Sequence, residues 1–210
     1  MRALTLLPLI VLTTGCSVFG VNYNTEEPSY RVLEADNDFE VRLYDSMVVA
    51  ATTVNGSFDS AGNRAFGALF GYISGENVTN SKIAMTAPVI ADQAGAAEGR
   101  KIPMTAPVLR ESNDQGWRYL FVLPEEFSLE NAPAPLNEQV KLTAEPAKKI
   151  AVLRYSGSMD EQKLEQKVSQ LQQWIADNQL VAVSQPRWAG YNPPWTLPFL
   201  RRNEVMIEVN

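Results

Sequence analysis

Apolar and polar residues alternate in several short stretches of the chain, a pattern that predicts β-strands with one buried face. The clearest stretch is 39–43. An apolar run rich in β-branched residues and alanine follows at 47–54, which predicts the pairing strand, with residues 44–46 as the turn. Further strands are predicted at 117–123, 140–144, 150–155 and 205–209.

Two other stretches carry the apolar spacing of a helix. The residues that share one face of the first helix are Phe66, Leu69, Phe70 and Ile73. Ser57 or Asp59 is expected to cap this helix and Gly75 to end it. The stripe of the second helix consists of Leu164, Val168, Leu171 and Ile175, after a capping box predicted at 158–161. Strands, a helix and strands therefore occur twice, which predicts two similar halves packed as one antiparallel sheet or barrel.

An eight-residue segment is nearly repeated. KIAMTAPV at 82–89 returns as KIPMTAPV at 101–108, with seven of eight positions identical. An alanine- and glycine-rich stretch separates the copies and predicts a hairpin of two adjacent strands, each ended by a proline. Met85 and Met104 then occupy matching positions. They either fill the core between sheet and helix or line a polarisable cavity for a flat apolar ligand.

The start of the chain has the features of an export signal. Arg2 precedes an apolar run at 4–12, which is shorter than the roughly 20 residues that span a bilayer. Cys16, the only cysteine, follows a small residue at the end of this segment. The arrangement resembles a bacterial lipoprotein signal, although Thr13 stands where leucine is usual.

This resemblance implies that residues 1–15 are a signal peptide and that Cys16 is lipidated. Residues 16–27 would then be the lipidated cysteine and a polar tether. Ser17 is similar to the pattern that sorts lipoproteins to the outer membrane. An ordinary cleaved signal with an incidental cysteine is the alternative.

The composition narrows the chemistry of the remaining chain. Its 210 residues are 45% hydrophobic and 20% charged, which is typical of a globular protein. One cysteine excludes an intramolecular disulfide and a multi-cysteine metal site, and the absence of histidine removes the usual general base and haem ligand. The net charge of −6 argues against nucleic-acid binding. Because Glu34, Glu40 and Glu204 are predicted to face solvent and no nucleophile–base pair is visible, we expect no enzyme.

Three groups of motifs, in this order, resemble the SOUL haem-binding family. They are EPxYxVLE at 27–34 with FEVRxY at 39–44, the doubled KIxMTAPV, and GYNPPW at 190–195 with PFLRRNEV at 198–205. The resemblance assigns residues 28–210 to a SOUL-type domain. It implies an α+β fold, a distorted eight-stranded antiparallel β-barrel with two flanking helices and a pseudo-two-fold internal repeat.

The resemblance also implies a non-covalent haem or related tetrapyrrole in an apolar groove beside the first helix, without a histidine ligand. Phe66, Leu69, Phe70 and Ile73 would form the apolar wall of the groove. Gly67 and Gly71 would let the ring approach the helix backbone, and Arg64 would pair with a propionate.

Other residues are candidates for the iron or the ring face. Met85 or Met104 would be a weak thioether ligand, Tyr191 a phenolate ligand, and Trp195 a stacking partner. Each candidate also has a structural alternative: the helix stripe as ordinary core, Arg64 as a solvated side chain, and residues 191–195 as a rigid turn. Residues 201–204 are predicted to form a hydrogen-bond and ion-pair cluster that fixes the last strand.

These features predict an exported, membrane-anchored haem- or tetrapyrrole-binding protein that acts as carrier, buffer or scavenger. The expected location is the periplasmic face of a bacterial membrane, with the outer membrane favoured. The alternative is a small-amphiphile sensor or protein-interaction module of the same fold that no longer binds haem. Because the chain is acidic, affinity for an anionic porphyrin must come from local apolar contacts.

Overall fold

The protein is described by a computed structural model that covers residues 25–56, 58–79 and 99–210. In chain order its elements are β1 (Tyr30–Asp36), β2 (Phe39–Tyr44), β3 (Met47–Val54), α1 (Phe58–Ser74), β4 (Asn77–Val78), β5 (Val108–Asn113), β6 (Gly116–Val122), β7 (Ala134–Pro135), β8 (Lys141–Glu145), β9 (Lys148–Tyr155), α2 (Glu161–Asp177), β10 (Arg187–Gly190), the short 3-10 helix η1 (Pro198–Leu200) and β11 (Asn203–Glu208).

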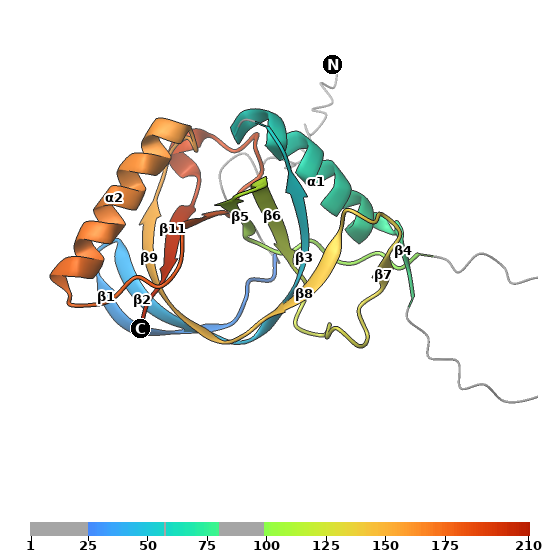
Figure 1. Ribbon diagram of the computed structural model, residues 1–210, viewed down its shortest axis with the longest axis horizontal. Coiled ribbons are helices and arrows are strands. Elements are labelled where there is room, and N and C mark those ends of the chain that lie inside the picture. The colour runs from blue at the N-terminus through green and yellow to red at the C-terminus, as the bar shows by residue number, and fades with distance from the viewer. Residues whose placement is uncertain (1–24, 57, 80–98) are drawn as a thin grey trace, which may run out of the picture.

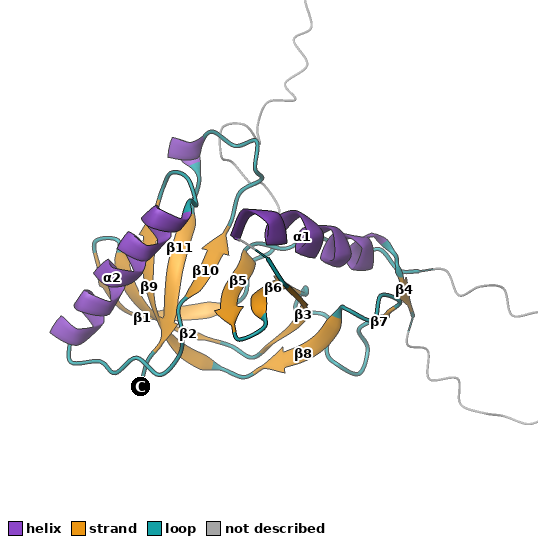
Figure 2. Cartoon of the chain, turned by 45° about the horizontal axis from the view of Figure 1, so that its top comes forward, coloured by secondary structure: helices purple, strands orange, loops and turns teal. Residues whose placement is uncertain are grey.

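Nine of the strands form one curled antiparallel sheet with two helices on its outside, an α+β arrangement (Figures 1 and 2). Their order is β1-β2-β9-β11-β10-β5-β6-β3-β8, and β4 pairs with β7 in a separate two-stranded sheet. The pair β3–β8 continues the pair β2–β9 in the same register. Tyr44 pairs with Lys148 at the end of β2–β9, and Met47 pairs with Glu145, three residues further along both strands. This long two-stranded ribbon joins the part of the sheet under α2 to the part under α1, and the whole sheet curls into a half-barrel (Figure 1).

The predicted strands at 39–43, 47–54, 117–123, 140–144, 150–155 and 205–209 and both helices are confirmed, with small shifts at their ends. The sheet differs from the expected eight-stranded barrel because it has nine strands and is open. Of the strands that the sequence did not predict, β1 is mostly exposed and β10 has only four residues, so neither carries a clear alternation. The pseudo-two-fold repeat stays a prediction.

Two local predictions were wrong. The second copy of the repeated octapeptide is not a strand over 101–107, since β5 begins only at Val108. Instead, the backbone N–H of Ala106 donates to the carbonyl of Glu26 (2.9 Å). The first copy, 82–89, lies outside the described residues.

The start of α2 also differs from the predicted capping box. Asp160 caps the helix by accepting from the backbone N–H of Lys163 (2.9 Å), and the Ser158 hydroxyl donates to Asp160 (2.5 Å). The helix therefore begins two residues later than a cap at Ser158 would require. For α1, Asp59 lies within the helix and Ser57 lies outside the described residues.

Glycine fixes the other end of α1, as the sequence predicted. Gly75 follows the helix with φ +118°, a conformation that favours glycine. Gly99 packs against it so closely that a Cβ on Gly99 would overlap the carbonyl oxygen of Gly75. Within 25–56, 58–79 and 99–210, no helix is long and apolar enough to cross a membrane.

The core has three parts, because both faces of the sheet are covered. One cluster lies between α1 and the strands β3 and β6, and a second lies between α2 and the strands β9 and β11. The third fills the inside of the curl, where Leu120 and Val122 point while Tyr119 and Phe121 point to α1. Since all three clusters lie within 25–210, this segment contains the core it needs to fold on its own.

Candidate functional site

The apolar stripe predicted on α1 divides into two parts. Leu69 is fully buried and Ile73 nearly so, whereas Phe66 and Phe70 are 39% and 48% exposed. The sheet-facing side of the helix also contains two fully buried alanines, Ala61 and Ala65, which let the helix lie close to the strands. The expectation that all four apolar residues form one wall of a groove was therefore wrong.

Phe66 and Phe70 form a surface that we call the aromatic ledge. Their rings stack with centroids 5.8 Å apart and planes 13° from parallel. Phe66 also rests edge-on against Phe121 of β6, at 5.4 Å and 66°. The ledge is thus supported from the sheet side while its outer side faces solvent, a geometry that suits stacking by a flat apolar ring.

The two glycines of α1 differ in what surrounds them. At Gly67, beside the ledge, a Cβ would meet nothing within 4 Å. At Gly71, the space for a side chain is occupied by the carboxylate of Glu76. Gly67 therefore allows a planar ligand to approach the helix backbone, whereas at Gly71 the side chain of Glu76 would first have to move away.

The remaining candidates are spread over the molecule. Arg64 is exposed on α1, and its guanidinium donates to the backbone carbonyl of Asn55, with which a propionate would compete. Met104 is 42% exposed in the segment before β5, and Trp195 is 63% exposed in the loop after β10. Met85 lies outside the described residues.

Tyr191 has a different environment from the one an iron ligand needs. Its side chain is buried, and its hydroxyl donates to the carboxylate of Glu204 (2.7 Å). Burial raises the pKa of Tyr191 well above its ordinary value, and the neighbouring charge of Glu204 raises it further. The structure therefore places a protonated phenol, already hydrogen-bonded to Glu204, inside the sheet rather than a phenolate beside α1.

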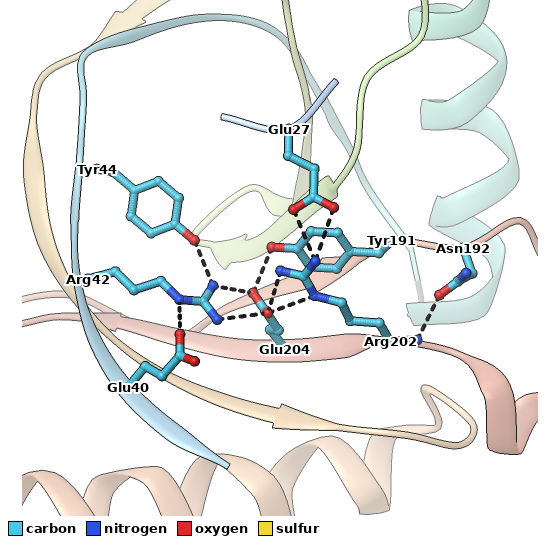
Figure 3. A network of polar contacts seen from close by, with 8 residues as sticks. All are labelled: Glu27, Glu40, Arg42, Tyr44, Tyr191, Asn192, Arg202 and Glu204. Atoms are coloured by element: carbon cyan, nitrogen blue, oxygen red, sulfur yellow. Dashed lines mark hydrogen bonds and ion pairs between the residues drawn. The ribbon is translucent and has the colours of Figure 1, made fainter. Parts of the chain in front are cut away.

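Glu204 is the centre of a polar network inside the curled sheet (Figure 3). It is fully buried and accepts two hydrogen bonds from Arg42 (2.9 and 3.1 Å) and one from Arg202 (3.0 Å), besides that of Tyr191. Arg42 also donates to Glu40 (2.6 Å) and to Tyr44 (3.0 Å). We call these residues, with Arg202 and Glu27, the interior network.

The prediction that Glu204 faces solvent was wrong. Alternation along β11 does put Glu204 on the side opposite Val205, which packs under α2. The sheet curls over that opposite side, so both faces of the strand are covered. In contrast, the predicted cluster at 201–204 is confirmed: Arg202 pairs with Glu204 (2.9 Å), and Asn203 donates to the carbonyl of Gly157 (2.9 Å).

The interior network holds fixed charges at neutral pH. Burial by itself would raise the pKa of Glu204, but hydrogen bonds and the charges of Arg42 and Arg202 outweigh it, and the pKa is lowered. Burial would lower the pKa of Arg42, yet the adjacent Glu204 carboxylate makes the net shift upward. Burial raises the pKa of Tyr44 to about 12. None of these groups is therefore poised for proton transfer near pH 7.

A second charged cluster lies at the opposite ends of β10 and β11. Its members are Glu111, Arg118, Glu145, Lys148, Arg187 and Glu208. Glu111 joins Arg118 (2.7 Å) and Arg187 (2.7 Å). Apolar side chains fill the inside of the sheet between this cluster and the interior network. The hollow at the second cluster, beside Ile150 and Met206, has about 230 Å³, which is below the roughly 300–1,000 Å³ of most ligand pockets.

A cavity of about 590 Å³ lies elsewhere, between the first described residues and the segment after β6. Of the described residues that line it, five are carboxylates, namely Glu26, Glu27, Asp45, Glu125 and Glu130, and none is a lysine or arginine. Such a lining repels the propionates of a tetrapyrrole. The residues present therefore fit a tetrapyrrole at the aromatic ledge and not in this cavity. Among the described residues, no group of three metal-binding side chains occurs.

The sequence and the fold were compared with known proteins. No curated protein sequence matches the chain. The C-terminal domain of EcmrR has a similar structure, with TM-score 0.56 and 12% identity over 86% of this chain and 98% of that domain. EcmrR in a complex with DNA also gives 0.56, with 13% identity over 82% of this chain and 57% of that one. A hydrolase from Listeria innocua gives 0.50, with 11% identity over 85% and 94%.

At these identities the structural likeness shows the fold alone. The family evidence comes from the sequence, because the family model described as SOUL heme-binding protein matches residues 25–208, almost everything after the N-terminal segment. The family is one that binds haem. By this match, the chain belongs to the SOUL heme-binding family.

Proposed function

We propose that this protein binds haem or a related tetrapyrrole at the aromatic ledge of α1 and acts as a carrier, buffer or scavenger. The observation that carries the proposal is the exposed Phe66–Phe70 stack, supported by Phe121 and bordered by open backbone at Gly67. Family membership supports the ligand class. The proposal assigns no reaction to the protein.

The physical basis of this binding is apolar. A tetrapyrrole stacked on the ledge would cover two aromatic side chains that are now 39% and 48% exposed. Arg64, on the same helix, would turn from the Asn55 carbonyl to a propionate, since a carboxylate is the better acceptor for a guanidinium. The sequence has no histidine, so we expect modest affinity and no strong protein ligand on the iron. Bound haem would itself supply the redox and ligand-binding chemistry of its iron.

A haem titration of residues 16–210, followed in the Soret region, tests the proposal. We expect saturable one-to-one binding, weakened about tenfold or more by Phe70→Glu because a carboxylate at the ledge repels the ring and its propionates. Val181→Glu is the matched control, since Val181 is 57% exposed and lies after α2. Circular dichroism confirms that both variants fold. Equal loss in both variants, or no saturation in the parent protein, contradicts binding at the ledge.

We further propose that the protein is exported and attached by a lipid on Cys16 to the periplasmic face of a bacterial membrane, with the outer membrane favoured. The support is the sequence alone, a short apolar run followed by a small residue and the only cysteine. Each buried CH₂ of an acyl chain contributes about 0.8 kcal/mol, so several chains anchor firmly. Metabolic labelling with palmitate should mark the protein, and Cys16→Ser should abolish the label.

A second candidate function is the binding of a small amphiphile. The 590 Å³ cavity favours it, because apolar side chains such as Met47 and Phe127 lie there beside five carboxylates. This lining suits an organic cation with an apolar body. Titration with a cationic dye distinguishes the two functions: a dye in the cavity binds without displacing haem, and Phe70→Glu leaves its affinity unchanged.

A further inference from the structure

The loop between β10 and β11 exposes a dense group of apolar side chains. Trp195 is 63% exposed and Phe199 69%, and Leu197 and Leu200 are 38% and 37% exposed. These four residues, which we call the apolar loop, lie within six positions of the chain. Among the described large hydrophobic residues, Phe199 has the highest exposed fraction. Clusters of this kind on protein surfaces mark interaction sites.

Hydrogen bonds to its backbone carbonyls fix the conformation of the apolar loop. The guanidinium of Arg201 donates to the carbonyls of Thr196 (2.7 Å) and Pro194 (2.6 Å). Thr196 itself is buried, and the carbonyl of Pro198 accepts from the backbone N–H of Gly157 (2.8 Å). The apolar side chains are therefore presented by a fixed backbone, so that docking costs little conformational entropy.

The base of the same loop contacts the N-terminal end of the described chain. Arg202 pairs with Glu27 (3.0 Å), and its backbone N–H donates to Asn192 (2.7 Å). Cys16 lies only nine residues before Thr25, a distance of about 30 Å at most for an extended chain. A lipid on Cys16 would therefore keep this end of the molecule close to the bilayer. In Figure 2, η1 is the short unlabelled helix that stands clear of the sheet, at the end where β11 begins.

We propose that Trp195, Leu197, Phe199 and Leu200 insert into the interfacial region of a phospholipid bilayer. The inference rests on the proposed lipid anchor. Tryptophan favours the membrane interface, because its ring is apolar while its indole N–H stays hydrated. Phenylalanine and leucine are typical of the apolar face of segments that lie in this interface. Four side chains alone bind a surface weakly, but an anchor raises their effective concentration at the bilayer. Because the chain carries −6, apolar contact rather than attraction to anionic lipids drives the insertion.

The single cysteine makes a direct test available. Residues 16–210 are coupled through Cys16 to a maleimide-bearing lipid in phosphatidylcholine vesicles, with or without bromine on the acyl chains. Trp195 reports on the loop, because Trp174 and Trp188 are only 9% and 8% exposed and Trp117 is half-buried. We expect bromine to quench the share of the fluorescence that Trp195→Phe removes. Anionic vesicles should give equal or weaker quenching.

Two double variants make the test specific. Phe199→Ser with Leu200→Ser should abolish the quenching, whereas Val181→Ser with Val183→Ser, a second exposed apolar pair, should retain it. Equal fluorescence on brominated and ordinary vesicles overturns the proposal, as does quenching that survives the loop variant. A blue shift of Trp195 that grows with protein concentration without vesicles indicates a second copy as the partner and also overturns it. Since the coupling supplies the anchor, failure here leaves lipidation of Cys16 to be judged by palmitate labelling.

Discussion

The interior network and the aromatic ledge differ in both place and support. Inside the sheet, Arg42 and Glu204 are charged and almost completely buried, and each is satisfied by several partners. Outside it, Phe66 and Phe70 are apolar and exposed, with protein on one side only. This placement reverses the usual distribution of charged and apolar side chains. The network is therefore committed to the fold, whereas the ledge has a free side available to a ligand.

Glu204→Gln is expected to cause the largest change, a loss of folding stability. The substitution keeps the shape of the side chain but leaves Arg42 and Arg202 without their buried counter-charge, so the free energy of unfolding should fall by about 3–5 kcal/mol. Urea unfolding followed by circular dichroism measures it. The double variant Arg42→Met with Glu204→Met should lose less than Glu204→Met alone, because no charge is left at position 42 and Arg202 keeps its ion pair with Glu27. A single-variant loss below about 1 kcal/mol would show that the network is not a buried ion pair of this kind.

The interior network also predicts that folding stability declines at both acid and alkaline pH. Tyr44 has a pKa of about 12 in the fold and Tyr191 also titrates above its ordinary range, so their stabilising contribution is complete below pH 10 and declines as the pH rises toward 12. Glu204 has a lowered pKa, so its contribution is present above the unfolded value of about 4.3 and is lost as the pH falls further. Urea midpoints between pH 3 and about 12 test both limits. Tyr44→Phe should reduce the loss of stability on the alkaline side, leaving the part due to Tyr191, and should leave the acid side unchanged.

Gly67→Leu should affect the aromatic ledge and leave the interior network intact, so that haem affinity and folding stability respond differently. Leucine fills the open space beside the ledge, so haem affinity should fall about tenfold or more. Stability should hold or rise by up to about 1 kcal/mol, because leucine has the higher helix propensity. Gln172→Leu, at an exposed position of α2, is the control for added surface hydrophobicity. Unchanged haem affinity in Gly67→Leu would place the ligand elsewhere.

Arg64→Ala is expected to cause the smallest change, a slight loss of haem affinity. An exposed ion pair contributes at most about 1 kcal/mol, so the haem dissociation constant should rise by no more than about fivefold, and less at high salt. Protoporphyrin dimethyl ester, which has no free propionate, should bind the parent protein and the variant equally. A loss of the same size with the ester would show that Arg64 acts through helix packing at Asn55 rather than through a propionate.

The sequence by itself determined the elements whose signal is local. Alternation identified β2 and β11, apolar runs identified β3 and β6, and helical spacing identified α1 and α2, because these patterns depend only on residues close together in the chain. The ordered motifs also indicated the family that the comparison confirmed. For the candidate site, the sequence identified Phe66, Phe70 and Gly67 on one helix.

The tertiary structure decided which faces are covered. Alternation divides β11 into two faces but does not say that the sheet curls over the one with Glu204, and so a buried carboxylate was predicted to be exposed. Helical spacing grouped Phe66 with Leu69, although the close approach of α1 at Ala61 and Ala65 buries only the second. The physical reason is the same in both cases: periodicity is a property of the segment, whereas burial depends on what distant parts of the chain bring against it.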